Sequence, residues 1–157
     1  MLLRLVFVAF LFFETMSGSA ARSKVYIKDH NSKIGAVCLQ QILNTANEAI
    51  VADGYFSIGL SGGSIPAILS AGLETTSIRT DFSKWRIVFV DERCVPLDDA
   101  DSSYKAFVPL FTKLNIPAAS MLLIDSFDDV DQASVNYNEK FVQMVPGGSV
   151  HIAVLGM

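Results

Sequence analysis

The chain has 157 residues, of which 51% are hydrophobic and 18% are charged, and its formal net charge is −4. This composition supplies enough apolar material for a folded core, which excludes a disordered chain, and the length suits one domain. Lysine and arginine form no basic cluster, which argues against nucleic acid or an acidic membrane surface as a partner.

The first 21 residues differ in composition from the rest of the chain. A short start containing Arg4 precedes an apolar run at 5–13, and small residues at 19–21 suit a cleavage site. This layout is typical of a secretory signal peptide, and the apolar run is too short to span a bilayer as a helix. We expect a leader at 1–21 and no stable membrane span. The alternatives are a buried strand or a first exon without targeting activity.

Residues 24–54 predict a short strand and a long helix. Lys24–Lys28 (K-V-Y-I-K) alternates as a strand does, and Asn31 is expected to cap the helix that follows. Apolar residues then recur at helical spacing: Ile34, Cys38, Leu39, Ile42, Leu43, Ala46, Ala49 and Ile50. The helix should end near Asp53–Gly54, because glycine readily takes the left-handed conformation of a C-cap.

Strands and helices alternate along the remaining chain. The expected strands are Tyr55–Leu60, Arg86–Val90, Met121–Ile124 and Ser149–Leu155. The expected helices are a short one from Ile65 with Pro66 in its first turn, Ser103–Leu114 and Val130–Val145. The order βαβαβαβαβ predicts an α/β fold with a largely parallel central sheet and flanking helices. In such sheets, ligands bind beyond the carboxyl ends of the strands.

A glycine turn within Leu60–Pro66 (L-S-G-G-S-I-P) joins a predicted strand to a predicted helix. Gly62 and Gly63 permit positive φ and a close approach of the backbone to a ligand. The N–H groups of the turn and the first helical residues lack intrahelical partners, so an anionic phosphate would gain charge-assisted hydrogen bonds there. Ser61 and Ser64 add hydroxyl donors. The alternative is a plain connection in which Ser64 only caps the helix.

Three charged residues, Asp91, Glu92 and Arg93, follow the next apolar strand at its carboxyl end. The guanidinium of Arg93 suits bidentate binding of a phosphate or carboxylate. Asp91 and Glu92 are candidates for orienting a sugar hydroxyl or a water. The alternative is a solvated loop with a local ion pair, which the presence of a second polar loop at a neighbouring strand end weakens.

The acidic stretch 98–104 is interpreted as a loop near the site, in which Asp101 or Ser102 caps the next helix and Tyr104 lies in its first turn. The two histidines, His30 and His151, are interpreted as structural or solvated. His151 begins the last strand, at the end opposite to where ligands bind.

No Ser-His-Asp or Cys-His arrangement emerges from the chain. The two cysteines, Cys38 and Cys94, lack zinc-ligand spacing. They are interpreted as buried or half-buried thiols, and the sequence leaves a disulfide between them open.

Four strings resemble 6-phosphogluconolactonases in order and spacing: G-L-S-G-G-S-I-P at 59–66, W-R-I-V-F-V-D-E-R-C-V-P at 85–96, D-S-S-Y at 101–104 and V-L-G-M at 154–157. The resemblance covers Val25–Met157. It implies that 22–157 is the N-terminal part of a single sugar-phosphate lactonase domain. The implied fold is the Rossmann-like layered fold shared with glucosamine-6-phosphate deaminases, incomplete at the C-terminus.

The resemblance also implies an activity. The family hydrolyses 6-phospho-D-glucono-1,5-lactone to 6-phosphogluconate in the oxidative pentose phosphate pathway, with no metal and no organic cofactor. The implied partner is a small sugar phosphate, and protein partners are not indicated. The implied substrate- and phosphate-binding residues are Ser61, Gly62, Gly63, Ser64, Asp91, Glu92 and Arg93. Ser102 and Tyr104 are implied to shape the site.

The sequence departs from the family pattern in three respects. The family segment L-G-x-G-x-D-G-H-T stops after Leu155–Met157, so its aspartate and its base histidine are expected beyond Met157, and we expect a fragment or truncated product of low stability that hydrolyses little. Residue 103 is Ser where Asn or Thr often stands. The leader indicates the secretory pathway, the ER lumen or secretion, whereas the family implies the cytosol.

Two alternatives remain for the function. One is a glucosamine-6-phosphate deaminase-like isomerase, in which an aromatic residue usually stands in place of Arg93. The other is a non-catalytic secreted or sugar-phosphate-binding module, which the leader and the missing histidine favour.

Overall fold

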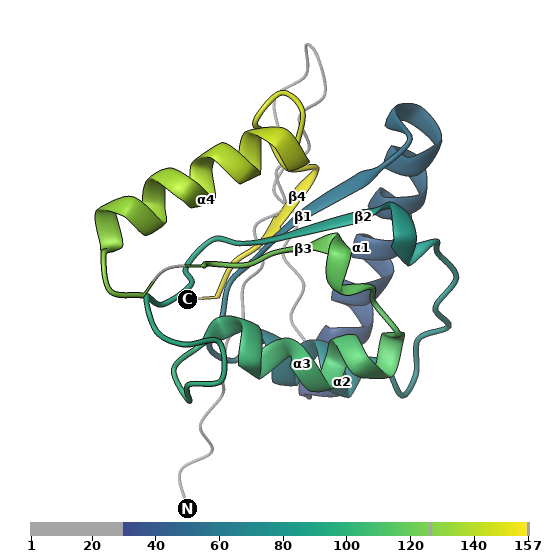
Figure 1. Cartoon of the computed structure of the whole chain (residues 1–157). Helices are drawn as coiled ribbons and strands as arrows, with labels where there is room; N and C mark the ends of the chain where they lie inside the picture. Colours follow the sequence, from purple (N-terminus) through teal and green to yellow (C-terminus); the bar gives the residue numbers. More distant parts are fainter. Residues whose placement is uncertain (1–29, 126, 157) are drawn as a thin grey trace, which may run out of the picture.

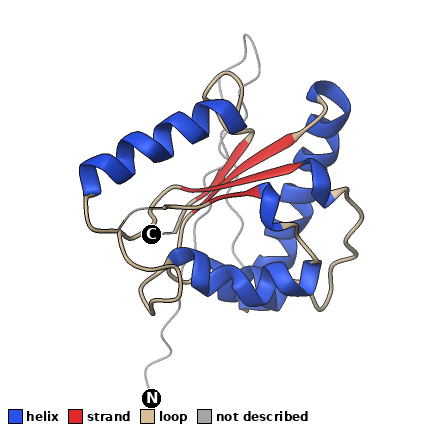
Figure 2. Ribbon diagram, in the orientation of Figure 1, coloured by secondary structure: helices blue, strands red, loops and turns tan. Residues whose placement is uncertain are grey.

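The computed structural model describes residues 30–125 and 127–156. In this part of the chain, a parallel four-stranded sheet has the order β3–β2–β1–β4 (Figure 2). The strands are β1 (Phe56–Leu60), β2 (Trp85–Phe89), β3 (Met121–Leu122) and β4 (Ile152–Val154). The helices are α1 (Asn31–Asp53), α2 (Ile65–Gly72), α3 (Ser103–Leu114) and α4 (Val130–Met144), with 3-10 turns at Phe82–Lys84 and Ala118–Ser120. The predicted α/β class with a parallel sheet is confirmed.

Helices cover both faces of the sheet. Figure 1 shows α1, α2 and α3 on one face and α4 on the other. The main core lies on the first face, where Phe56, Ile58 and Leu60 of β1 are buried against the helices. Alternate strand residues point to opposite faces, so Val88 and Leu122 belong to a smaller core beneath α4. In the described part of the chain α4 is the single helix on that face, and fewer apolar groups are buried there.

Helices α1 and α2 pack at backbone contact. A Cβ built on Gly35 would lie 2.0 Å from the Ile68 carbonyl oxygen, and one built on Gly72 would lie 2.2 Å from the Gly35 carbonyl carbon. Only hydrogen fits at both positions. This contact fixes the axis of α2, and therefore the position of the glycine turn that precedes it.

The two ends of α1 differ in how well the sequence predicts them. Gly54 has φ +81° and donates its N–H to the Ile50 carbonyl at 3.2 Å, which confirms the predicted left-handed C-cap. The prediction that Asn31 caps the helix is wrong. His30 occupies the N-cap position, because its extended backbone already accepts the first helical hydrogen bonds, from Lys33 and Ile34.

Strand β3 is shorter than the predicted Met121–Ile124 and lies at the edge of the described sheet. The reason lies on α4. The hydroxyl of Tyr137 accepts the N–H of Phe89 at 2.8 Å and donates to the Phe89 carbonyl at 3.0 Å. One phenol thus takes both backbone groups that a longer β3 would have paired.

The other predicted elements are present with small changes of boundary. The α2 and α3 predictions are confirmed, and α4 ends one residue before the predicted Val145. The predicted Tyr55–Leu60 and Arg86–Val90 appear as β1 and β2. The last strand is shorter than predicted, because residues 146–150 form a turn in which Gly148 donates to the Val145 carbonyl. The expected leader and the strand Lys24–Lys28 lie outside the described residues.

Cys38 and Cys94 are not joined by a disulfide, in line with the interpretation of both as buried or half-buried thiols. Cys38 is buried in α1, and burial raises the pKa of its thiol to about 12. Cys94 is half-buried. Among the helices of the described residues, none has both the length and the apolar character needed to cross a bilayer.

Candidate functional site

The polar loops predicted from the sequence meet at the carboxyl edge of the sheet. They are the glycine turn Ser61–Ser64 after β1, the loop Asp91–Arg93 after β2, and the start of α3. The N–H of Val90 donates to the Leu60 carbonyl and the N–H of Ser61 donates to the Val154 carbonyl, both at 3.0 Å. The backbone ladder therefore continues past the strand ends and holds the loops side by side.

The carboxylate of Asp91 binds the glycine turn. Its Oδ1 accepts the N–H of Gly62 at 2.9 Å, and its Oδ2 accepts the hydroxyl of Ser61 at 2.5 Å. The sequence predicts this residue as a group that orients a sugar hydroxyl or a water. In the structure its two oxygens hold the turn in place, and contact with a ligand is left to their remaining lone pairs.

The carboxylate of Glu92 binds the start of α3. Its Oε1 accepts the N–H of Ser103 at 2.7 Å and the N–H of Arg93 at 2.9 Å, while its Oε2 accepts the N–H of Tyr104 at 2.9 Å. A negative charge is favoured at the positive end of a helix dipole, and it satisfies N–H groups that lack intrahelical partners. Glu92 thereby ties the Asp91–Arg93 loop to α3.

Two adjacent serines at the start of α3 have different environments. Ser102 is the N-cap, and its Oγ accepts the N–H of Lys105 at 3.1 Å, which confirms one of the two predicted caps. Ser103 faces the glycine turn, because a Cβ built on Gly62 would lie 2.4 Å from its Oγ. The sequence motifs do not assign Ser103 to the site. Its position as the first helical residue, directly after the N-cap, is the signal that could have assigned it to the site.

Several donors at this edge are unpaired. Within residues 30–125 and 127–156, the guanidinium of Arg93 makes no hydrogen bond or ion pair, and Arg93 is exposed. The N–H groups of Gly63, which has φ +65°, and of Ser64 likewise have no partner there. A guanidinium and unpaired N–H groups at a helix start are both donors of the kind that bind phosphate.

His151 lies at the opposite end of the sheet, where the strands begin. Its Nδ1 accepts the N–H of Ser57 at 2.9 Å, and its Nε2 lies 3.2 Å from Asp53 Oδ2. The side chain of Ser57 is fully buried, so it is closed to a substrate although its Oγ lies 2.8 Å from Nδ1. The interpretation of His151 as structural is confirmed.

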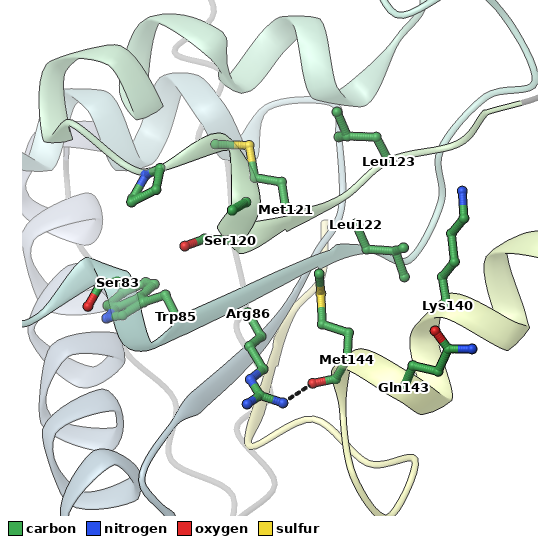
Figure 3. A pocket seen from close by; sticks show the side chains of 12 residues that line it. Ser83, Trp85, Arg86, Ser120, Met121, Leu122, Leu123, Lys140, Gln143 and Met144 are labelled. Carbon is green, nitrogen blue, oxygen red and sulfur yellow. Dashed lines mark hydrogen bonds between the residues drawn. The ribbon is translucent and has the colours of Figure 1, made fainter.

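Two cavities border the α4 face. One of about 710 Å³ adjoins Asp91 and Glu92, with Tyr137 among its lining residues. Burial and the nearby Glu92 charge raise the pKa of Tyr137 to about 12, so its hydroxyl stays protonated. The other, of about 730 Å³, borders β3 and is shown in Figure 3 with Arg86 and Met144. Only the first of the two adjoins the loops of the candidate site.

The described residues hold no cluster of three His, Cys, Asp or Glu side chains that would suit a metal ion.

The model of the family "Glucosamine-6-phosphate isomerases/6-phosphogluconolactonase" matches residues 29–157. The chain belongs to this family. It is 33% identical to a 6-phosphogluconolactonase of Rattus norvegicus over 76% of this chain and 49% of the relative. It is 41% identical to a probable 6-phosphogluconolactonase 4 of Arabidopsis thaliana over 59% of this chain and 38% of the relative.

Solved structures of the family share the fold. A 6-phosphogluconolactonase from Trypanosoma cruzi superposes with a TM-score of 0.63 at 21% identity, over 82% of this chain and 52% of that protein. One from Thermotoga maritima gives 0.62 at 16% identity, over 76% and 53%. The chain thus spans about half the length of these family members. The match confirms the Rossmann-like layered fold expected from the sequence motifs.

Proposed function

We propose that this chain supplies the phosphate-binding part of a 6-phosphogluconolactonase site, which hydrolyses 6-phospho-D-glucono-1,5-lactone to 6-phosphogluconate. The observation that carries the proposal is that two neighbouring loops, joined through Asp91, hold unpaired donors: the Arg93 guanidinium on one and the N–H groups of Gly63 and Ser64 on the other. Family membership indicates a sugar phosphate as the ligand, and this geometry supports binding through its phosphate.

The proposed roles follow from which groups are already hydrogen-bonded within the protein and which are not. Gly63, Ser64 and Arg93 bind the 6-phosphate directly. Gly62 lets the turn approach the ligand, while its own N–H is bound to Asp91. Asp91 and Glu92 hold the two loops in register and shape the sugar side of the site. The remaining proposed residues are Ser61, which donates to Asp91, and Ser102 and Tyr104 at the start of α3.

Lactone hydrolysis also needs a general base. The base takes a proton from water, the water oxygen bonds to the lactone carbonyl carbon, and the ring C–O bond breaks as its oxygen gains a proton. The family pattern places that histidine after Leu155–Met157. His151 is held at the other edge by Ser57 and Asp53. A general base of this kind contributes roughly 10²–10⁴-fold in rate.

Calorimetric titration of the chain tests the proposal. We expect 6-phosphogluconate to bind, and gluconate, which lacks the phosphate, to bind far more weakly. Arg93→Ala should abolish that preference, whereas Lys113→Ala, an exposed cation at the far end of α3, should retain it. Equal binding of 6-phosphogluconate by the wild type and Arg93→Ala would contradict the assigned phosphate site.

Glucosamine 6-phosphate in the same titration addresses the isomerase alternative, because the family includes both activities. Arg93 favours the lactonase, and we expect glucosamine 6-phosphate to bind less tightly than 6-phosphogluconate. A clear preference for the amino sugar, with ammonia released from it, would favour the deaminase instead.

The location of the protein is a separate part of the proposal. The composition of residues 1–21 supports a secretory leader, removed after Ala21. N-terminal sequencing of the chain expressed in eukaryotic cells should then find Arg22 as the first residue. Recovery of a cytosolic product that begins at Met1 would contradict the leader and support the cytosolic alternative.

A further inference from the structure

Ser102 and Ser103 differ in one respect that bears on the ligand. Both are nine-tenths or more buried, with 2% and 5% of their surface exposed. The hydroxyl of Ser102 is engaged as the helix cap. The hydroxyl of Ser103 has no hydrogen-bond partner among the residues that the structure describes. No fully buried side-chain oxygen or nitrogen of the described residues lacks a partner, so this Oγ itself keeps some contact with solvent and is open to a ligand that accepts its proton.

The position of this hydroxyl is fixed by the groups around it. The backbone N–H of Ser103 donates to Glu92 Oε1 at 2.7 Å, which anchors the residue to the loop that carries Arg93. Its Oγ lies against Gly62, where a Cβ would come within 2.4 Å of it. Gly62 is the residue immediately before the unpaired N–H groups of Gly63 and Ser64. The hydroxyl therefore faces the turn to which the proposed function assigns the phosphate.

We infer that the Ser103 hydroxyl is a further phosphate-binding group of this site, donating its proton to a phosphate oxygen of the sugar phosphate. The inference rests on the proposed function and extends it, since the glycine turn and Arg93 supply the other donors. The role is specific for an anionic acceptor, because the surrounding groups at the turn are donors, and the nearby Asp91 and Glu92 carboxylates are already bound to N–H and O–H groups.

The test compares Ser103→Ala with Ser120→Ala, a second buried serine, whose hydroxyl donates to the Phe82 carbonyl outside the site. Ser103→Ala should weaken binding of 6-phosphogluconate by roughly ten- to a hundredfold, as expected for a hydrogen bond to a charged acceptor, while the weak binding of gluconate stays unchanged. Ser120→Ala should lower the midpoint of chemical unfolding and leave the affinity ratio of the two ligands unchanged. Both titrations are run on protein whose circular dichroism matches that of the wild type.

A measurement on the wild type guards against a variant that fails to fold. With serine labelled at ¹³Cβ, saturation with 6-phosphogluconate should shift the Ser103 signal and leave that of Ser120 in place. If Ser103 does not respond, or if Ser103→Ala binds as the wild type does while Arg93→Ala is impaired, the inference is wrong and the proposed function stands. If the wild type binds 6-phosphogluconate no better than gluconate, both fall together.

Discussion

Similar polar residues lie at the amino and the carboxyl end of the sheet, but they differ in whether their hydrogen-bonding groups have partners within the protein. At the amino end, Arg86 lies over the Tyr55 ring at 4.0 Å and donates to the Met144 carbonyl at the end of α4 (Figure 3). At the carboxyl end, Arg93 has no such partner among the described residues. Residue type therefore does not separate structural from functional groups in this fold. What separates them is whether the protein itself has already used their donors and acceptors.

The serines repeat the contrast. Ser57 at the amino end is fully buried and bonded to His151 in both directions, and its Oγ accepts the N–H of His151 at 3.1 Å. At the carboxyl end, the carbonyl of Ser64 accepts the N–H of Ile68, but its hydroxyl makes no cap hydrogen bond and its N–H has no partner in the described structure. A parallel sheet flanked by helices leaves its carboxyl end open to ligands, and this chain keeps its unpaired donors there.

The most decisive test of this contrast replaces each of the two arginines by alanine in turn. Arg93→Ala should weaken binding of 6-phosphogluconate by roughly ten- to a hundredfold, because it removes charge-assisted hydrogen bonds worth about 1.5–3 kcal/mol. It should leave the free energy of unfolding within about 0.5 kcal/mol of the wild type, as for an exposed side chain. Titration calorimetry and urea unfolding give the two quantities.

Arg86→Ala should do the reverse. It removes the basic group that donates to the Met144 carbonyl at the end of α4, a helix whose last turn holds no basic residue, and it uncovers the Tyr55 ring. The free energy of unfolding should fall by about 1–3 kcal/mol, with the affinity for 6-phosphogluconate unchanged in the folded fraction. A loss of affinity without a loss of stability would break the comparison.

A smaller effect is expected for Ser57→Ala. The change removes one of the two acceptors of the His151 N–H, the Ser57 Oγ, while the Ser57 carbonyl still accepts that N–H and the Ser57 N–H stays bonded to Nδ1. The free energy of unfolding should fall by about 1 kcal/mol. Ligand affinity should not change, and a change would mean that the amino end is coupled to the site.

A further effect is expected at alkaline pH. The pKa values of Cys38 and Tyr137 rise to about 12 from 9.0 and 10.0, in both cases chiefly because burial disfavours the charged form. Both groups keep their protons in the folded state while the unfolded chain releases them, so the stability they contribute is complete below about pH 9 and is lost towards pH 12. Urea unfolding at pH 8 and 10.5 measures this loss.

Cys38→Ala and Tyr137→Phe should each make that pH dependence less steep, although each also lowers stability at pH 8. Since Tyr137 bridges the N–H and C=O of Phe89 at the end of β2, its replacement should also alter the neighbouring loop. An unchanged pH dependence in both variants would mean that other groups titrate in this range.

The sequence predicts the elements whose signals are local. Helix α3 begins and ends where expected, because Ser102 supplies a cap three residues from the N–H it accepts. Strand β3 is mispredicted, because it ends where Tyr137, on a later helix, takes the backbone of Phe89. No pattern within a strand records a partner so far along the chain.

The site shows the same limit. Its residues could be found from the sequence, because polar groups directly follow two apolar strands. Their hydrogen-bond partners could not be predicted, since Asp91 binds Ser61 from 30 residues away and Glu92 binds Ser103 from 11 residues away. Only the fold brings these loops together. It shows that the carboxylates hold the loops in place, while the donors of Arg93, Gly63 and Ser64 remain for a ligand.

Amide chemical-shift mapping tests the central claim most directly, because it reports both ends of the sheet in one titration. With 6-phosphogluconate, the N–H signals of Gly63 and Ser64 and the guanidinium Nε–H of Arg93 should move, and they should move little with gluconate. The signals of Arg86 and of Lys140, beside the cavity of Figure 3, should stay in place with both ligands. Shifts at Arg86 and Lys140 with none at Gly63, Ser64 and Arg93 would contradict the assignment of the phosphate site to the carboxyl edge.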